Sequence, residues 1–116
     1  MKTLFVLNDT PYGSERSYNG LRLANALAKR EGEQVRVFLM ADAVGCAVAG
    51  QRTPNGYYNL ERLLSAASRH GAEIGLCGSC MDARGVDEAA LAEGARRSSL
   101  DELAEWTLWA DKVVSF

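Results

Sequence analysis

Short apolar runs of strand length alternate along this chain with longer segments of helical periodicity, and this alternation most restricts the folds open to it. The apolar runs cover residues 3–7, 35–40, 73–77 and 112–116, and residues 95–97 are expected to form a further short strand. Strands separated by helices form βαβ units, and such units build a mostly parallel sheet. Because several runs are apolar at nearly every position, helices must cover both faces of the sheet. We therefore predict an α/β fold, a three-layer α/β/α sandwich with a mostly parallel sheet of about five strands.

The first helix is predicted between residues 14 and 29, where Ser14 can cap the amino end. The side expected to pack on the sheet follows helical spacing at Gly20, Leu23, Ala24 and Leu27. The opposite side, expected to face solvent, carries Arg22, Asn25 and Lys29.

Residues that favour helix ends place the other helices. Asn59 can cap a helix that begins at residue 60 and stops before Gly71. Ser99, with Glu102 three residues later, forms a capping box for a last helix over residues 100–110. Further predicted segments are a short helix over residues 43–49 capped by Asp42, a surface loop over 50–56, a loop or short helical turn over 78–85 and a helical stretch over 87–93.

The length of 116 residues fits one domain, residues 1–116, which can fold without a disulfide or structural metal. The formal net charge of -2 provides no basic excess, so nucleic-acid binding is not expected. No apolar run is long enough to span a membrane, and Asn8 and Asp9 interrupt the apolar start too soon for a secretory signal. We expect a cytoplasmic protein, whose thiols are kept reduced.

Two of the chain's three cysteines, Cys77 and Cys80, lie in a loop where a parallel sheet places its binding site. Such sites lie beyond the carboxyl ends of the strands, which here are the loops over residues 8–14, 41–56 and 77–85. Backbone N–H groups at a helix start and the nearby Arg84 would favour the thiolate, the reactive form of cysteine. The C-x-x-C spacing also lets one thiol attack a mixed disulfide or persulfide on the other.

The cysteine pair allows several interpretations. The two residues can be packing residues without chemistry. A zinc site needs four ligands, which this pair, Cys46 and one histidine do not supply at the expected spacing, so only a metal shared between subunits remains. A thioredoxin-like oxidoreductase would carry the motif after its first strand and face it with a cis-proline. We favour sulfur chemistry at a nucleophilic thiol, and the other interpretations stay open.

The loop after the first strand is a second candidate binding site. A strand-to-helix loop can bind an anion, as the phosphate loop of a flavodoxin-like fold does. A turn followed by a helix cap is the simpler explanation of its candidate residues, which are Asp9, Tyr12, Gly13 and Ser14. A bound flavin is the alternative cofactor, and its stacking partners would be Tyr12, Tyr57 and Tyr58.

The remaining candidates each have a structural and a functional interpretation. Asp82 and Arg84 either form an ordinary exposed ion pair or tune the Cys77 thiolate. Cys46 is expected to be a packing residue, and His70 is expected to be a cation at a helix end. The last helix carries two tryptophans that pack in the core or in a subunit interface, Trp106 and Trp109.

Four sequence blocks cover the chain in order: VLNDTPYGSERSYNGLRLANALAKREG, VRVFLMADAV, LCGSCMDARGV and ADKVVSF. Together they resemble the DsrE/DsrF-like family, and most of all its YchN-like branch. The resemblance implies a parallel five-stranded α/β/α sandwich, in agreement with the alternation of strands and helices. It also implies assembly into homo- or hetero-oligomers, either trimers or hexamers.

The same resemblance implies a function. Relay subunits of this family carry sulfane sulfur as a persulfide on one cysteine, at the position that Cys77 occupies here. Cys80 is an additional cysteine of the YchN-like branch, where it can act as a resolving thiol. We therefore expect a sulfur-relay protein with protein sulfur donors and acceptors and without a metal or organic cofactor. The alternative is a non-catalytic oligomeric protein that binds a small ligand or partner and uses its cysteines structurally.

Overall fold

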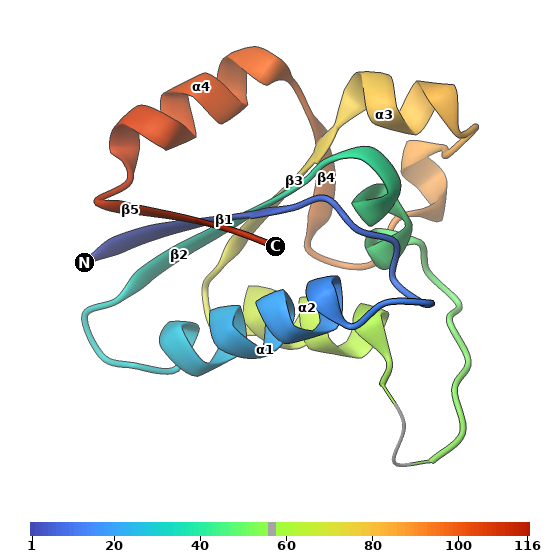
Figure 1. Ribbon diagram of the computed structural model, residues 1–116, viewed down its shortest axis with the longest axis horizontal. Helices are drawn as coiled ribbons and strands as arrows, with labels where there is room; N and C mark the ends of the chain where they lie inside the picture. The colour runs from blue at the N-terminus through green and yellow to red at the C-terminus, as the bar shows by residue number, and fades with distance from the viewer. Residues whose placement is uncertain (56–57) are drawn as a thin grey trace.

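The computed structural model describes residues 1–55 and 58–116, and the strands and helices found there alternate along the chain (Figure 1). In chain order they are β1 (Lys2–Leu7), α1 (Arg16–Ala28), β2 (Gln34–Leu39), the 3-10 helix η1 (Ala41–Ala47), α2 (Leu60–Arg69), β3 (Glu73–Cys77), α3 (Gly78–Ala83), the 3-10 helix η2 (Glu88–Ala90), β4 (Ala95–Ser98), α4 (Leu100–Trp109) and β5 (Lys112–Ser115). None of these helices is long and apolar enough to cross a membrane.

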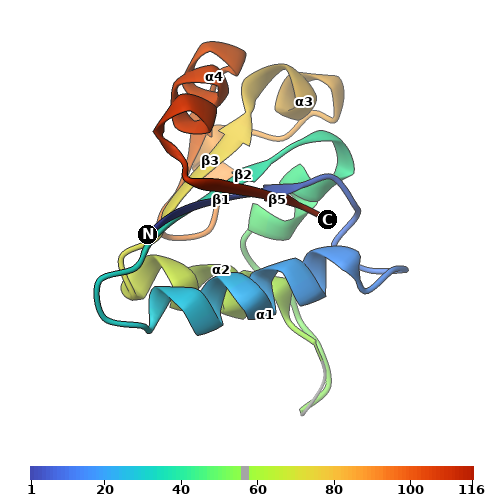
Figure 2. The same cartoon turned by 60° about the vertical axis from the view of Figure 1, so that its left-hand side comes forward.

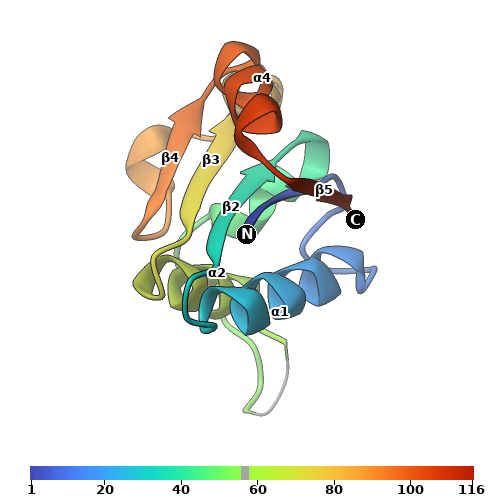
Figure 3. The same ribbon diagram turned by 90° about the vertical axis from the view of Figure 1, so that its left-hand side faces the viewer.

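The five strands form one sheet in the order β4-β3-β2-β1-β5 (Figure 3). All neighbouring strands are parallel, and Val37 in the centre pairs with Phe5 of β1 and Ile74 of β3. The carboxyl ends of β1, β2 and β3 therefore meet at one edge. The predicted parallel sheet of about five strands is confirmed.

Helices cover both faces of the sheet, which confirms the predicted three-layer sandwich (Figure 2). α1 and α2 lie side by side on one face, and α4 lies on the other. Successive strand residues point to opposite faces, so β1, β2 and β3 each contribute to both cores. The larger core, under α1, α2 and η1, includes Phe5, Leu7, Val37, Leu39, Ile74 and Leu76. The smaller core, under α4, is formed by Leu4, Phe38, Cys77 and Trp106.

The buried side of α1 differs from the prediction. Leu21 is fully buried and Leu23 is 40% exposed, although the sequence pattern placed Leu23 on the inner side. Asn25, predicted to face solvent, is buried, and its amide donates hydrogen bonds to the carbonyl oxygens of Leu21 and Leu63. The second bond reaches α2, so α1 is rotated toward the neighbouring helix as well as toward the sheet.

Helix ends follow the predicted signals at Asn59, Gly71 and Ser99. The side chains of Asn59 and Ser99 accept hydrogen bonds from the backbone N–H three residues on, at 3.0 and 3.2 Å. Gly71 has φ of 96°, as the residue after a helix end requires. Ser14 lies before the helix rather than at its cap, and its hydroxyl accepts a hydrogen bond from the N–H of Arg16.

Two short helices differ from the prediction, the first in position and helix type and the second in length. The helix expected over residues 43–49 is the 3-10 helix η1, where Asp42 lies inside the first turn and Met40 is the cap. The helical stretch expected over 87–93 is reduced to η2, which has three residues. The reason is that the ends of these segments pair with each other, through a bridge between Val48 and Leu91 and two backbone hydrogen bonds.

Trp106 anchors α4 on the sheet. Its ring is 4% exposed, meets Phe38 edge to face, and lies between the guanidinium groups of Arg36 and Arg96 at 5.2 and 5.6 Å. Gly75 makes room for it, because a Cβ atom there would lie 3.2 Å from the ring. Trp106 thus belongs to the core, whereas Trp109 is half-buried beneath the guanidinium of Arg36.

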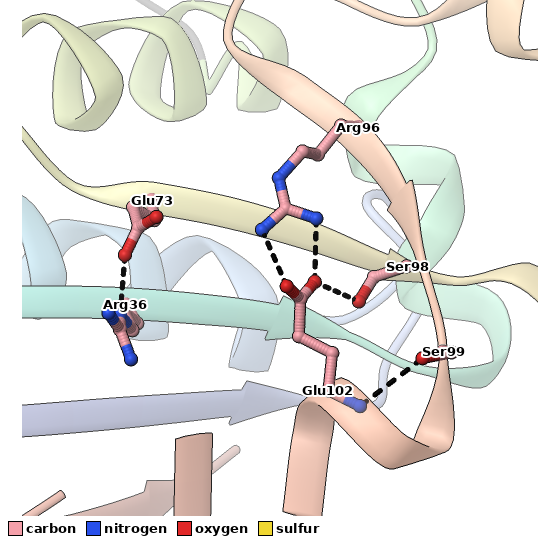
Figure 4. Close-up of polar contacts among 6 residues, drawn as sticks. All are labelled: Arg36, Glu73, Arg96, Ser98, Ser99 and Glu102. Carbon is pink, nitrogen blue, oxygen red and sulfur yellow. Dashed lines mark hydrogen bonds and ion pairs between the residues drawn. The ribbon is translucent and has the colours of Figure 1, made fainter. Parts of the chain in front are cut away.

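Glu102 joins α4 to the edge strand β4 (Figure 4). Its carboxylate accepts two hydrogen bonds from Arg96, at 2.6 and 3.0 Å, and one from the hydroxyl of Ser98. Its backbone N–H binds the cap residue Ser99. These contacts fix the junction between β4 and α4, which forms one wall of the site described next.

Candidate functional site

Cys77 lies at the point where β3 ends and α3 begins. It is the last residue of the strand and the cap of the helix, and its sulfur accepts a hydrogen bond from the N–H of Cys80 at 3.3 Å. The segment predicted as a loop or short helical turn is thus the short helix α3. The predicted position of Cys77, at the carboxyl edge of a parallel sheet, is confirmed by the strand pairing.

The two thiols of the C-x-x-C pair are free and face each other. Their sulfur atoms are 2.6 Å apart, and the hydroxyl of Ser79 lies 3.3 Å from the sulfur of Cys77. Cys77 is 8% exposed, while Cys80 is half-buried. The pair is therefore close enough for one sulfur to attack a persulfide or mixed disulfide on the other without a change of fold.

The surroundings of the pair separate the two pKa values. Burial alone would raise the pKa of Cys77, but hydrogen bonds from Cys80, Ser79 and their backbone N–H groups together hold it below the usual value of a thiol. Burial and the hydrogen bond to Cys77 raise the pKa of Cys80. Cys77 is thus the better thiolate, and Cys80 is its proton-bearing neighbour.

A pocket of about 420 Å³ opens beside Cys77 on the α4 side of the sheet. Phe38, Met40 and Leu100 provide apolar surface, while three serines provide hydroxyl groups. Its lining residues are Phe38, Met40, Cys77, Gly78, Ser79, Cys80, Arg97, Ser98, Ser99 and Leu100. This volume suits a small ligand or the end of a flexible side chain.

Two arginines lie beside the cysteine pair, and each is paired with a carboxylate. Arg97 binds Asp82 through two hydrogen bonds of 2.8 and 2.9 Å. Arg84 binds Asp42 at 2.9 Å and donates to the carbonyl oxygen of Cys80 at 3.1 Å. Asp82 and Arg84 are therefore not partners in an ion pair, contrary to one of the two predictions made for them.

Sequence reasoning missed Arg97, which lines the pocket. It lies 20 positions after Cys77, on β4, and comes close only because β4 pairs with β3, with Leu76 opposite Arg97. The sequence predicted a short strand at this point but contained no signal for its position in the sheet. Ser79 was also missed, although its place inside the C-x-x-C motif was a usable signal.

The binding residues predicted in the loop after β1 do not line the pocket beside Cys77. Asp9 accepts a hydrogen bond from Ser14 at 2.6 Å, and Tyr12 connects Gln51 to the backbone of Leu60. Gly13 has φ of 95°, which makes the turn.

The alternative flavin site would need tyrosine rings with a free face for stacking. Tyr58 stacks on Tyr18 with ring centroids 4.0 Å apart, so that one face of its ring is already occupied. Tyr57 falls outside the described residues.

Cys46 and His70 occupy positions that fit a structural role. Cys46 is fully buried in the larger core, and burial raises the pKa of its thiol to about 12, an effect only partly opposed by a hydrogen bond with Ser17. His70 is exposed at the carboxyl end of α2. Among residues 1–55 and 58–116, no three His, Cys, Asp or Glu side chains gather as a metal ion would require.

Comparison with known proteins identifies relatives that match this chain over nearly its whole length. The DsrE/DsrF-like family matches residues 1–116. Protein YchN of Escherichia coli strain K12 is 42% identical over 116 residues, 99% of this chain and 98% of that protein. The crystal structure of ychN protein from E. coli matches with a TM-score of 0.93 and covers 100% of this chain and 99% of that chain. A sulfurtransferase TusD homolog of Vibrio parahaemolyticus is 29% identical over 123 residues, 96% of this chain and 94% of that protein.

Proposed function

The chain belongs to the DsrE/DsrF-like family, and from this membership and its cysteine pair we propose a sulfur-relay protein that carries sulfane sulfur as a persulfide on Cys77. The more distant relative named as a sulfurtransferase TusD homolog supports the sulfur-relay reading. The observation that carries the proposal is the sulfur of Cys77. It borders a pocket, and hydrogen bonds from its neighbours lower its pKa.

Loading of sulfur follows from the nucleophilic character of Cys77. The thiolate attacks the outer sulfur of a donor persulfide, R–S–SH. A new S–S bond forms on Cys77, the donor's S–S bond breaks, and its electron pair leaves on the donor sulfur, which becomes a thiolate. The products are the Cys77 persulfide and the donor thiol, so that no external oxidant or reductant is needed.

Unloading has two routes, which differ in the role of Cys80. In the first, an acceptor thiolate attacks the outer sulfur, becomes a persulfide itself and restores the Cys77 thiolate. In the second, the Cys80 thiolate attacks the inner sulfur, at the position where the two sulfurs lie 2.6 Å apart. That step forms a Cys77–Cys80 disulfide and releases hydrosulfide, and an external dithiol must then reduce the disulfide. We propose the first route for relay and the second for discharge when no acceptor is present.

The test is the intact mass of the protein after incubation with a sulfane-sulfur donor and removal of excess donor. We expect the mass of one added sulfur atom in the parent and in Cys46→Ala, and no addition in Cys77→Ser. Cys80→Ala should retain the added sulfur longer than the parent, because the discharge route is lost. A protein that gains no sulfur from any donor, or gains it equally in Cys77→Ser, overturns the proposal.

A non-catalytic binding protein is the second candidate, favoured by the large apolar side chains that remain exposed on and after α4. Leu100, Leu108 and Val113 are 72%, 87% and 50% exposed. Under this second candidate function, copies of the chain assemble through the exposed apolar residues of α4 and β5. The cysteines are then structural, and the pocket beside Cys77 holds a ligand or partner. Iodoacetamide separates the two candidates, because fast labelling of Cys77 at neutral pH requires a reactive thiolate and a structural thiol stays inert. For either candidate we propose a cytoplasmic homo-oligomer, a trimer or hexamer.

A further inference from the structure

The guanidinium of Arg97 lies directly against Gly78, the residue that follows Cys77. A Cβ atom on Gly78 would lie 2.9 Å from Cζ, Nε and Nη2 of the Arg97 guanidinium. Real Cβ atoms essentially never approach other heavy atoms so closely, so any larger residue must displace the guanidinium. The glycine that follows the first cysteine of the motif therefore lets a cation lie in direct contact with the start of α3.

Asp82 holds the Arg97 guanidinium in this position, but it does not cancel the positive charge that the guanidinium presents to the pocket. It accepts two hydrogen bonds from a group that has five N–H donors, so donors remain for a ligand. Its carboxylate is 65% exposed and does not line the pocket, whereas Arg97 does. The positive end of the pair thus lies toward Cys77 and the negative end toward solvent.

Sulfur transfer at Cys77 brings two negative charges together, and this is the difficulty that a cation relieves. The attacking sulfur is a thiolate, and a donor that bears a carboxylate brings a second negative charge into the same pocket. Two like charges at contact distance repel each other strongly in a partly buried site. Among the residues that line the pocket, Arg97 is the one that carries a positive charge.

We propose that Arg97 is the residue by which the Cys77 pocket recognises negatively charged sulfur carriers, namely small persulfides or thiols that also bear a carboxylate. This inference rests on the proposed sulfur-relay function. In the loading step described above, the guanidinium stabilises the negative charge on the attacking sulfur, on the donor and on the departing thiolate. Neutral and cationic carriers lack this interaction and react more slowly.

The test compares two alkylating reagents of similar size, anionic iodoacetate and neutral iodoacetamide, on Cys77 in a Cys80→Ala background. We expect Arg97→Gln to lower the ratio of the iodoacetate rate to the iodoacetamide rate by at least about threefold. Arg97→Lys should restore part of the ratio. Arg69→Gln, which removes an equal charge at the far end of α2, is the control and should leave the ratio unchanged.

Sulfur donors then test the substrate class. We expect the parent to load sulfur faster from glutathione persulfide than from cysteamine persulfide, and Arg97→Gln to lose this preference while it retains native circular dichroism. An alkylation ratio that is the same in Arg97→Gln and the parent overturns the inference. A protein that gains no sulfur from either donor overturns the proposed function instead, and the alkylation ratio still decides whether Arg97 recognises anions.

Discussion

The thiol of Cys80 donates a hydrogen bond to the sulfur of Cys77 across 2.6 Å, and the two residues consequently differ in acidity. The donor stabilises the thiolate of Cys77 and keeps its own proton. The short helix α3 creates this relationship, since it brings a residue three positions along the chain back to the residue that caps it.

Removal of the donor should raise the pKa of Cys77. In Cys80→Ala we expect the midpoint of the pH dependence of Cys77 alkylation to move to higher pH, because one hydrogen bond to the thiolate is lost. Iodoacetamide rates measured from pH 6 to pH 10, with the labelled site identified by peptide mass, give this midpoint. Cys46→Ala serves as the control and should not move it. An unchanged midpoint in Cys80→Ala would show that the Cys80 thiol does not stabilise the thiolate.

Cys46 should make the folded state less stable at alkaline pH. Burial raises its pKa to about 12, so the folded chain keeps a proton that the unfolded chain loses above about pH 8.5. The unfolded state then binds fewer protons, and the free energy of unfolding falls as pH rises through this window. We expect a loss of about 1–2 kcal/mol by about pH 10 from this group.

Urea unfolding of the parent and of Cys46→Ala at several pH values measures this effect. The variant starts less stable because a buried side chain is shortened, but its stability should fall less steeply with pH. Parallel slopes for the two proteins would contradict the assignment. At neutral pH, Cys46 should also resist alkylation until the protein unfolds.

Trp106 should contribute more to stability than any other single residue of α4. Trp106→Ala removes a buried ring that packs on Phe38 and lies between two guanidinium groups, and we expect a loss of about 3–5 kcal/mol in the free energy of unfolding. Glu105→Ala, on the exposed side of the same helix, should change stability by less than about 0.5 kcal/mol. Chemical unfolding of both variants checks the contrast, and comparable losses would mean that α4 is not anchored through Trp106.

The exposed apolar residues of α4 and β5 should be covered in solution by other copies of the chain. We expect light scattering to show a trimer or hexamer, and Leu108→Glu to lower the assembled mass because a charge then replaces an apolar side chain that is 87% exposed in one copy. Arg30→Glu, an exposed residue after α1, is the control. A monomeric parent contradicts the expected assembly, and an unchanged oligomer in Leu108→Glu contradicts the choice of surface.

Local patterns in the sequence were sufficient to predict the strands, the parallel type of the sheet and the position of Cys77 at the end of a strand. Apolar runs mark β1, β2, β3 and β5, and the caps Asn59 and Ser99 mark helix starts, because these signals depend on nearby residues only. Asn25 could not be placed in this way. Its burial depends on the carbonyl oxygen of Leu63, which belongs to another helix.

Long-range pairing also explains why the candidate site was predicted only in part. Cys77, Cys80 and Arg84 lie close together in sequence, and the structure keeps them close. Arg97 enters the pocket through the order of the strands, and its ion pair with Asp82 spans 15 positions. A pattern that describes single strands contains no information on which strands are neighbours.

The charges on the outermost strands have a consequence for the behaviour of the protein at high concentration. β4 and β5 lie at the two edges of the sheet, each is four residues long, and they carry Arg96, Arg97 and Lys112. Short edges with positive side chains are poor templates for a strand from another molecule. Growth of the sheet from one molecule into the next, which is the first step toward fibrillar aggregates, is therefore disfavoured at both ends.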